Sequence, residues 1–279
     1  MKIIKTIADL QNQLQQQQNG SKRVALVPTM GALHSGHLSL IALAKAQAEI
    51  VVCSVFVNPT QFTDARDLER YPRPVEADLA KLEQADCDVV FMPEAQEMYP
   101  QKEHWHLDIG AIENRLEGRF RPGHYQGVMQ IVYKLFMAVK PDLAFFGQKD
   151  FQQVRVIEKM TELKNLPVKI VMCPIIRDAD GLAMSSRNIH LTAEESKHAL
   201  ILSWALSQLK KSFIKEASEE LCKEAIELIN IEPMVQLDYL EIVNTQDLDS
   251  DITDPDKGII ALVAAKVGQT RLIDNMILA

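Results

Sequence analysis

The sequence is poor in the features that mark membrane, secreted and nucleic-acid-binding proteins. It has no apolar run approaching the roughly 20 residues that a membrane-spanning helix needs, and no apolar segment of signal-peptide length near its start. Its 30 Lys and Arg are outnumbered by 38 Asp and Glu, for a formal net charge of -8. Nonspecific binding to phosphate backbones requires many clustered cations. We therefore expect neither nucleic acid nor a membrane as a partner.

Cysteine is also scarce. The four cysteines Cys53, Cys87, Cys173 and Cys222 are scattered without C-x-x-C spacing, and three of them lie in or beside apolar stretches. Reduced thiols in a hydrophobic core explain this pattern better than a disulfide framework or a metal site. Together with the missing signal peptide, the pattern predicts a cytoplasmic protein.

The residues that are abundant predict a globular α/β protein. The chain has 279 residues, of which 47% are hydrophobic and 24% charged, as in ordinary folded proteins. From Arg23 onward, longer helical patterns separate five apolar runs, VALVPT, VVCSVFV, DVVFMP, LAFFGQ and VKIVMCP. This alternation predicts crossover connections and a Rossmann-like, doubly wound parallel sheet. The run Gln15 to Gln18 predicts only the exposed end of a first helix.

After about Cys173 the pattern changes. Amphipathic helices are predicted at Ala193 to Lys211 and at Ser218 to Asn230, followed by the apolar runs LDYLEIVN, GIIALVAAKV and TRLIDNMIL. The connections between these runs are too short for helical crossovers, so we expect antiparallel strands. We predict a ligand-binding domain over residues 1–175 and a smaller α+β lid domain over residues 176–279.

The first predicted strand runs into a segment that carries glycine and histidine. This segment consists of Met30, Gly31, Ala32, Leu33, His34, Ser35, Gly36 and His37. Ligands collect at the carboxyl ends of parallel strands, and unpaired N–H groups at a helix start attract phosphate. His34 and His37 would donate hydrogen bonds to a transferring phosphoryl group, and Gly36 would let the backbone approach it. Helix capping explains this H-x-G-H pattern about equally well, whereas zinc lacks a third ligand at metal-like spacing.

Two further segments follow predicted strands. Asn58 and Gln61 suit hydroxyl and carboxylate groups of a small polar molecule, although Asn58-Pro59 would also form an ordinary turn. Gly147, Gln148, Lys149 and Asp150 lead into a helix whose first turn holds Gln152 and Gln153. An ammonium at this place can follow phosphate charge, with a surface Lys-Asp pair as the alternative.

A polar loop lies near the predicted domain boundary. It reads GLAMSSRN, which places Met184, Ser185, Ser186 and Arg187 in a row. Two hydroxyls beside a guanidinium are suited to gripping a triphosphate, and an ordinary capped turn is the alternative.

Taken together, these segments resemble the pantothenate synthetases, a family of the nucleotidylyltransferase superfamily that shares a HIGH-type core with class I aminoacyl-tRNA synthetases. The matching segments are VPTMGALHSGHLSL, SVFVNPTQF, YPR at Tyr71 to Arg73, RFRPGHYQGV, FFGQKDFQQ and GLAMSSRN, in the family's order over nearly the whole chain. The resemblance implies that ATP, with Mg²⁺, converts pantoate into pantoyl-adenylate, and that β-alanine then displaces AMP. It also implies a homodimer. The alternative is another nucleotidylyltransferase of the same fold.

The resemblance further implies roles for residues. The catalytic residues would be His37, His34 and Lys149. The ATP site would contain Met30 to His37, Gly147, Gln148, Lys149, Asp150, Met184, Ser185, Ser186 and Arg187, with Ile176 touching the adenine by its backbone. Gln61 and Gln153 would hold pantoate, near Asn58, Tyr71 and Arg121, and Gln61 would also meet β-alanine. Many relatives carry Glu in place of Gln148.

The chemistry that the resemblance implies joins two anions. Positive charge on Lys149, Arg187, the two histidines and Mg²⁺ would lower that barrier. The intermediate would be a mixed anhydride that water destroys, so a cover is expected. The carboxyl-terminal domain and the 60 to 72 loop are predicted to supply it.

Overall fold

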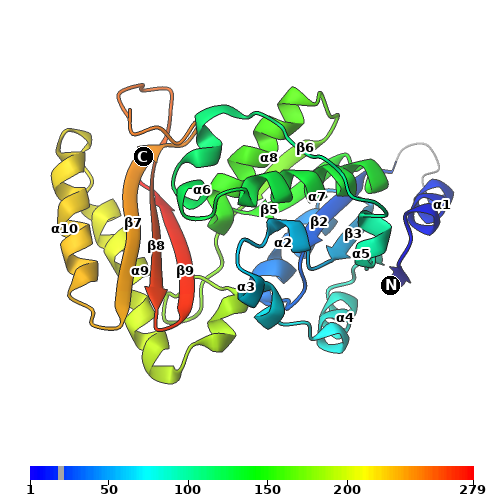
Figure 1. Ribbon diagram of the computed structural model, residues 1–279, viewed down its shortest axis with the longest axis horizontal. Helices are drawn as coiled ribbons and strands as arrows, with labels where there is room; N and C mark the ends of the chain where they lie inside the picture. Colours follow the sequence, from blue (N-terminus) through cyan, green and yellow to red (C-terminus); the bar gives the residue numbers. More distant parts are fainter. Residues whose placement is uncertain (18–21) are drawn as a thin grey trace.

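The computed structural model describes residues 1–17 and 22–279 (Figure 1). The first helix, α1 (Ile7–Gln17), carries Gln15 and Gln16 on its exposed end, as predicted, whereas Gln18 lies outside the described residues. Over the described ranges, no helix has the length and apolar character needed to cross a membrane.

A parallel sheet forms the centre of the larger domain. Its strands are β1 (Lys2–Ile4), β2 (Val24–Thr29), β3 (Ile50–Val55), β4 (Val89–Phe91), β5 (Leu143–Gly147) and β6 (Lys169–Cys173). They are arranged in the order β1-β4-β3-β2-β5-β6, and every pairing is parallel. The predicted doubly wound fold is confirmed, and β1 is an addition that the sequence analysis did not contain. The chain builds outward from β2 in both directions, so the switch point lies between β2 and β5.

Helices cover both faces of this sheet. The helices of this part of the chain are α1, α2 (Ser35–Lys45), α3 (Ala65–Arg70), α4 (Val75–Gln84), α5 (Ala95–Met98), α6 (Glu117–Phe120), α7 (His124–Val139) and α8 (Phe151–Leu163), with the 3₁₀ helices η1 (Pro59–Gln61), η2 (Gly110–Asn114) and η3 (Gln148–Asp150). Successive strand side chains point to opposite faces. Val24 and Leu26 therefore join the core under α1, α7 and α8, and Ala25 and Val27 join the core under α2 and α4. Burial on both faces explains why these strands read as continuous apolar runs.

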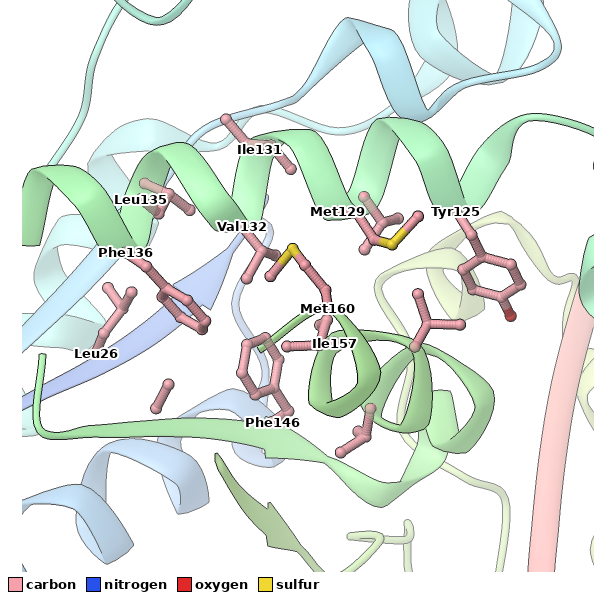
Figure 2. Packing of buried hydrophobic residues seen from close by; sticks show 14 of the residues in the cluster. Leu26, Tyr125, Met129, Ile131, Val132, Leu135, Phe136, Phe146, Ile157 and Met160 are labelled. Carbon is pink, nitrogen blue, oxygen red and sulfur yellow. The ribbon is translucent and has the colours of Figure 1, made fainter. Parts of the chain in front are cut away.

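Figure 2 shows how α7 closes the first of these cores. Residues of α7 lie over the sheet and beside α8, and the cluster includes Leu26, Tyr125, Met129, Val132, Leu135, Phe136, Phe146, Ile157 and Met160. The turn at η1 touches the same helix so closely that a Cβ on Gly127 would lie 2.2 Å from the Thr60 carbonyl oxygen. Glycine is therefore required where α7 passes the loop that follows β3.

The carboxyl-terminal part contains an antiparallel sheet and two long helices. The strands β7 (Val235–Asn244), β8 (Ile259–Val267) and β9 (Thr270–Ile277) pair in that order, and α9 (Ala193–Ser212) and α10 (Ser218–Asn230) cover one face. The short helices η4 (Ser186–His190) and η5 (Lys215–Ala217) precede α9 and α10 respectively. Both predicted helices and the antiparallel strands are confirmed.

The strand β8 is buried on both faces. Ile260, Leu262 and Ala264 join the core of the parallel-sheet domain. The alternating residues Ala261, Val263, Ala265 and Val267 pack under α9 and α10. The two sheets are therefore joined through a common core, and the division between residues 175 and 176 stays a prediction.

Candidate active site

A cavity opens at the carboxyl ends of β2, β3, β5 and β6. Its wall includes Thr29 at the end of β2, Ser54 in β3, Gly147 at the end of β5 and Ile176 after β6. These strands flank the point where the strand order reverses, which is the usual ligand site of an open α/β sheet. The polar loop before α9 completes the wall with Ser185 and its neighbours.

Most of the residues predicted for the site meet at this cavity. Those lining it are Met30, His34, Gly36, His37, Asn58, Gln61, Tyr71, Arg121, Gly147, Lys149, Asp150, Gln153, Ile176, Met184, Ser185, Ser186 and Arg187. Those that do not line it are Gly31, Ala32, Leu33, Ser35 and Gln148. His34 and His37, Lys149 and the serine–arginine loop (Ser185 to Arg187) are far apart in the sequence. They nevertheless line the same cavity.

The two imidazoles cap the helix that they precede. His34 is the residue before α2, and its Nδ1 accepts the N–H of Gly36 at 3.1 Å, while Nδ1 of His37 accepts the N–H of His34 at 3.3 Å. The rings therefore satisfy the N–H groups of His34 and Gly36, so these two are not unpaired as expected. A Cβ on Gly36 would lie 2.8 Å from the His34 ring. Capping and placement in the cavity, weighed as alternatives from the sequence, occur together.

This capping fixes the protonation of both rings. Since Nδ1 of each ring accepts a backbone N–H, the single proton of the neutral imidazole must sit on Nε2. Burial, followed by the charge of Lys149, lowers the pKa of His34 to about 4, and burial, followed by His34, lowers the pKa of His37 to about 3. The expectation that these histidines supply positive charge is wrong. Each offers a neutral Nε2–H donor instead.

The loop between β2 and α2 is held by a residue that the sequence analysis missed. Asp78 of α4 is 1% exposed, and its two carboxylate oxygens accept the N–H groups of Ala32 and Leu33 at 2.7 Å each. Gly31 and Ala32 have φ values of 80° and 50°, a region that costs energy for Ala32. A Cβ on Gly31 would lie 2.9 Å from the same carboxylate. These bonds to Asp78 explain why the loop residues turn away from the cavity.

The Lys149 segment differs from expectation at one position. Lys149 and Asp150 line the cavity, and a Cβ on Gly147 would meet nothing within 4 Å, so this glycine borders open space. Gln148 instead donates its side-chain N–H to Oδ1 of Asn275 in β9 at 3.1 Å. The placement of Gln148 at the cavity is therefore corrected, because its amide is used in a contact with the carboxyl-terminal sheet.

The serine–arginine loop (Ser185 to Arg187) is tied to two other segments, the loop before α2 and helix α3. Ser185 caps the turn that follows it, and the Ser186 hydroxyl donates to the carbonyl of Ala32 at 3.0 Å. Nη2 of Arg187 donates to Asp67 of α3 at 2.8 Å. Burial, the largest influence, acts to lower the pKa of the Arg187 guanidinium, but the charge and hydrogen bond of Asp67, together with Tyr71 and Asp150, raise it overall. The capped turn expected as an alternative is present, and its residues still line the cavity.

Buried amides and an imidazole form a polar wall. Nδ2 of Asn58 donates to the side-chain Oε1 of Gln61 at 3.1 Å, and Nδ1 of His124 donates to the backbone carbonyl of Gln61 at 2.7 Å. With its proton on Nδ1, His124 can accept at Nε2 the N–H of Arg121 at 3.1 Å. Burial, followed by the charge of Arg121, lowers the pKa of His124 to about 3, so this ring is neutral as well. His124 thereby connects Gln61 to Arg121.

Another part of the cavity wall is apolar. It is formed mainly by α7 and β5, through Val128, Ile131, Val132, Leu135 and Phe146. A cavity with one apolar side and a few fixed polar groups suits a small organic ligand that carries both methyl and polar groups.

Comparison with known proteins decides the family. Residues 2–277 match the family model described as Pantoate-beta-alanine ligase. The chain belongs to this family. The ligase is 45% identical over 279 residues to the pantothenate synthetase of Thermoanaerobacter sp. (strain X514), covering 99% of this chain and 98% of the relative. It is 46% identical over 278 residues to the pantothenate synthetase of Porphyromonas gingivalis (strain ATCC 33277), covering 99% of each.

Solved structures agree with this assignment. Pantothenate synthetase from Thermus thermophilus is similar with a TM-score of 0.91 and 38% identity, covering 100% of this chain and 99% of that one. The pantoate–beta-alanine ligase from Francisella tularensis, solved in complex with beta-gamma ATP and beta-alanine, has a TM-score of 0.83 and 32% identity, covering 100% and 98%. The ligase described here is thus an enzyme that joins pantoate to β-alanine, rather than another nucleotidylyltransferase of the same fold.

Proposed function

We propose that the ligase works in two steps with ATP as its co-substrate. In the first, a carboxylate oxygen of pantoate attacks the α-phosphorus, the bond to the bridging oxygen of the β-phosphate breaks, and pyrophosphate leaves. In the second, the amine of β-alanine attacks the acyl carbon of pantoyl-adenylate, the acyl–oxygen bond breaks, and AMP leaves as the nitrogen loses a proton. The ATP and β-alanine found in the Francisella tularensis relative support both co-substrates.

The observation that carries the proposal is the convergence of phosphate-binding groups on one cavity. His34 and His37, Lys149 and the Ser185 to Arg187 loop all line it. Attack of a carboxylate on a phosphate joins two anions, so fixed donors and cations aimed at the transferring phosphoryl group lower the barrier. In this scheme His37 and Lys149 act on the reacting phosphate, and His34 and Arg187 act on the phosphates beside it.

The polar and apolar walls suit the two parts of pantoate. Gln61 and Gln153 would bind its hydroxyl and carboxylate oxygens, and the apolar face of α7 would cover its methyl groups. Gln61 would also meet β-alanine. Asn58 orients the Gln61 amide, and Arg121 adds a cation beside it.

The remaining cavity residues suit the nucleotide. Ile176, on the segment after β6, would contact the adenine through its backbone, and Tyr71 lies near the serine–arginine loop, with the Arg187 guanidinium 6.0 Å from its ring centre. Met30, Gly36, Gly147 and Met184 would border the phosphates and ribose.

The cavity also fits a nucleotide-bound Mg²⁺. Within the described ranges, Asp150 is the one carboxylate that lines it. Mg²⁺ in nucleotide sites is held mostly by substrate phosphates and water, with one or two carboxylates from the protein. Asp150 would supply that carboxylate, and the ion would neutralise phosphate charge when bound.

A cover over the intermediate is supported by one ion pair. Asp67 belongs to the 60–72 loop and Arg187, which lines the cavity, to the start of the carboxyl-terminal part, so their contact joins these two segments. We propose that these segments exclude water from pantoyl-adenylate until the amine of β-alanine attacks it.

The decisive experiment uses mass spectrometry. The purified enzyme is mixed with ATP, Mg²⁺ and pantoate without amine, and pantoyl-adenylate is expected to accumulate on the protein with one equivalent of pyrophosphate released. Added β-alanine should then consume it and release AMP. Pyrophosphate release that appears only after β-alanine is added, with no adenylate detected, contradicts the proposal.

We also propose that the ligase is a cytoplasmic homodimer. The family resemblance supports the dimer, and the four free cysteines, three of them buried, support a reducing compartment. Sedimentation velocity at micromolar concentration tests the dimer. A single species with the monomer mass of 31.4 kDa would contradict it.

A further inference from the structure

Asn275 of β9 reaches from the carboxyl-terminal sheet to the segment that carries Lys149. Its side chain is buried with the residue only 1% exposed, and Nδ2 donates to the backbone carbonyls of Gln148 at 2.9 Å and Lys149 at 3.0 Å. Two carbonyl oxygens can be met only by the NH₂ end of the amide, so the orientation of Asn275 is determined. Its Oδ1 then accepts the Gln148 side-chain N–H.

We propose that Asn275 is a positioning residue for Lys149. Two hydrogen bonds hold the backbone carbonyls on either side of the Lys149 Cα, and a third holds the Gln148 side chain. Together they set the point from which the long ammonium side chain enters the cavity. A flexible lysine places its charge accurately only if its backbone is fixed. This inference rests on the proposed role of Lys149 at the transferring phosphate.

The neighbour of Asn275 makes a second connection from the same strand. Asp274, 4% exposed, pairs with Arg177 through contacts of 2.6 and 2.9 Å. Arg177 in turn donates to the Gly181 carbonyl at 3.2 Å and forms a backbone bridge with Ala183, next to the serine–arginine loop. Two adjacent residues of β9 therefore hold the segments that carry Lys149 and Arg187, two of the cations at the cavity.

These contacts give the carboxyl-terminal sheet a role in adenylation itself. Removing the amide of Asn275 leaves the carbonyls of Gln148 and Lys149 without their buried donor, so the Lys149 backbone between them is free to shift. A displacement of about 1 Å at a catalytic group costs up to about 10²-fold in rate. The loss is expected in kcat, because Lys149 acts mainly on charge that develops during the reaction.

The test is a double-mutant cycle on pantoate-dependent pyrophosphate release. Asn275→Ala is expected to lower kcat by about 10- to 100-fold with little change in the KM for ATP. In the Lys149→Ala background, the same substitution should cost less than about twofold, because the group that Asn275 positions is already gone. Equal losses in both backgrounds, or an unchanged kcat in the single variant, overturn the proposal.

Asn244 provides a matched control for a purely structural effect. It is a fully buried asparagine in β7 of the same sheet, and its amide binds the 247–251 loop away from the cavity. Asn244→Ala should lower the melting temperature and leave kcat within about twofold at temperatures where it is folded. A comparable loss of kcat in both asparagine variants would assign the effect to the sheet as a whole and overturn the proposal.

A second variant covers the case in which Asn275→Ala does not fold. Asn275→Asp keeps the shape of the side chain and replaces the donor by an oxygen that the two carbonyls repel. The same loss of kcat is expected, and an unchanged kcat overturns the proposal. Failure of the underlying function would look different, since Lys149→Ala alone would then retain near-native pyrophosphate release.

Discussion

Nη2 of Arg187 lies 2.8 Å from Oδ2 of Asp67, and this contact joins α3 to the segment before α9 that lines the cavity. A guanidinium tied in this way keeps its position without a ligand and retains further N–H groups for phosphate. The pair is partly exposed, with 30% and 38% of the Arg187 and Asp67 side chains accessible. We therefore expect it to fix the position of the Arg187 guanidinium more than to stabilise the fold.

Loss of this tether should weaken nucleotide binding. Asp67→Asn is expected to raise the KM for ATP by about 3- to 10-fold while kcat changes less, because Arg187 then samples several orientations before binding. Asp64→Asn is the control on the same loop, since Asp64 binds Arg66 locally and Asn caps a helix equally well. Steady-state kinetics at varied ATP compares the two, and equal KM values would refute the role of Asp67.

The histidine and lysine at the reacting phosphate should dominate turnover. His37→Ala and Lys149→Ala are each expected to lower pantoate-dependent pyrophosphate release by about 10²- to 10³-fold, the usual cost of removing one fixed donor from a transition state. Circular dichroism should show a folded protein in both cases. Lys159→Ala, a partly exposed lysine on α8, serves as the control. A folded variant with near-native adenylation would remove that residue from the mechanism.

Asp78 should matter for both stability and rate. Asp78→Asn leaves one carbonyl oxygen for two N–H groups, and a bond to a charged acceptor contributes about 1.5–3 kcal/mol. We expect the free energy of unfolding to fall by about 2 kcal/mol and kcat to fall by at least about tenfold, because the Gly31–Leu33 loop that leads to His34 is released. Glu76→Gln, on the exposed part of α4, should change neither. Urea denaturation and pyrophosphate release measure the two effects, and a native-like variant would contradict them.

The buried histidines predict a loss of stability in mild acid. The folded-state pKa of His34 is lowered from an ordinary 6.5 to about 4, and those of His37 and His124 to about 3, mainly by burial. Below pH 6.5 the unfolded chain therefore takes up protons that the folded chain refuses until about pH 4 to 3. The free energy of unfolding should fall as the pH is lowered through this window, by up to about 1.4 kcal/mol per pH unit for each ring.

Urea titrations at about pH 7.5 and about pH 5.5, on either side of the ordinary histidine pKa, test this dependence. His124→Gln should reduce the pH slope by about one proton, because it removes one of the three rings. A free energy of unfolding that is unchanged between the two pH values would show that these rings are not held neutral.

Residues at strand ends were predictable from sequence because their position follows from topology. Lys149 and Asn58 each come directly after an apolar run, and parallel strands bring such positions to one edge. The strand Lys2–Ile4 was not predictable in this way, since three residues carry no periodicity and β1 is defined by its pairing with β4. The helix pattern that follows Lys2–Ile4 could be recognised in the sequence. The strand with which this segment pairs, β4, lies far along the chain.

Residues that act through others were missed for a different physical reason. Asp78 binds a loop more than forty positions away, and Asn275 binds a segment that is 126 and 127 positions away. Local composition gives no indication of such contacts. The neutral state of His34 and His37 was missed because it depends on burial and on ring nitrogens that accept backbone N–H groups, both of which require the fold.

The strand β8 offers its alternating side chains to two hydrophobic cores at once. If either sheet unfolds, apolar side chains that pack against the other sheet become exposed to water. Heat should therefore unfold the whole chain in one cooperative transition, with equal calorimetric and van't Hoff enthalpies. An isolated amino-terminal half would expose to water the apolar side chains that Ile260, Leu262 and Ala264 cover, and it should aggregate rather than fold.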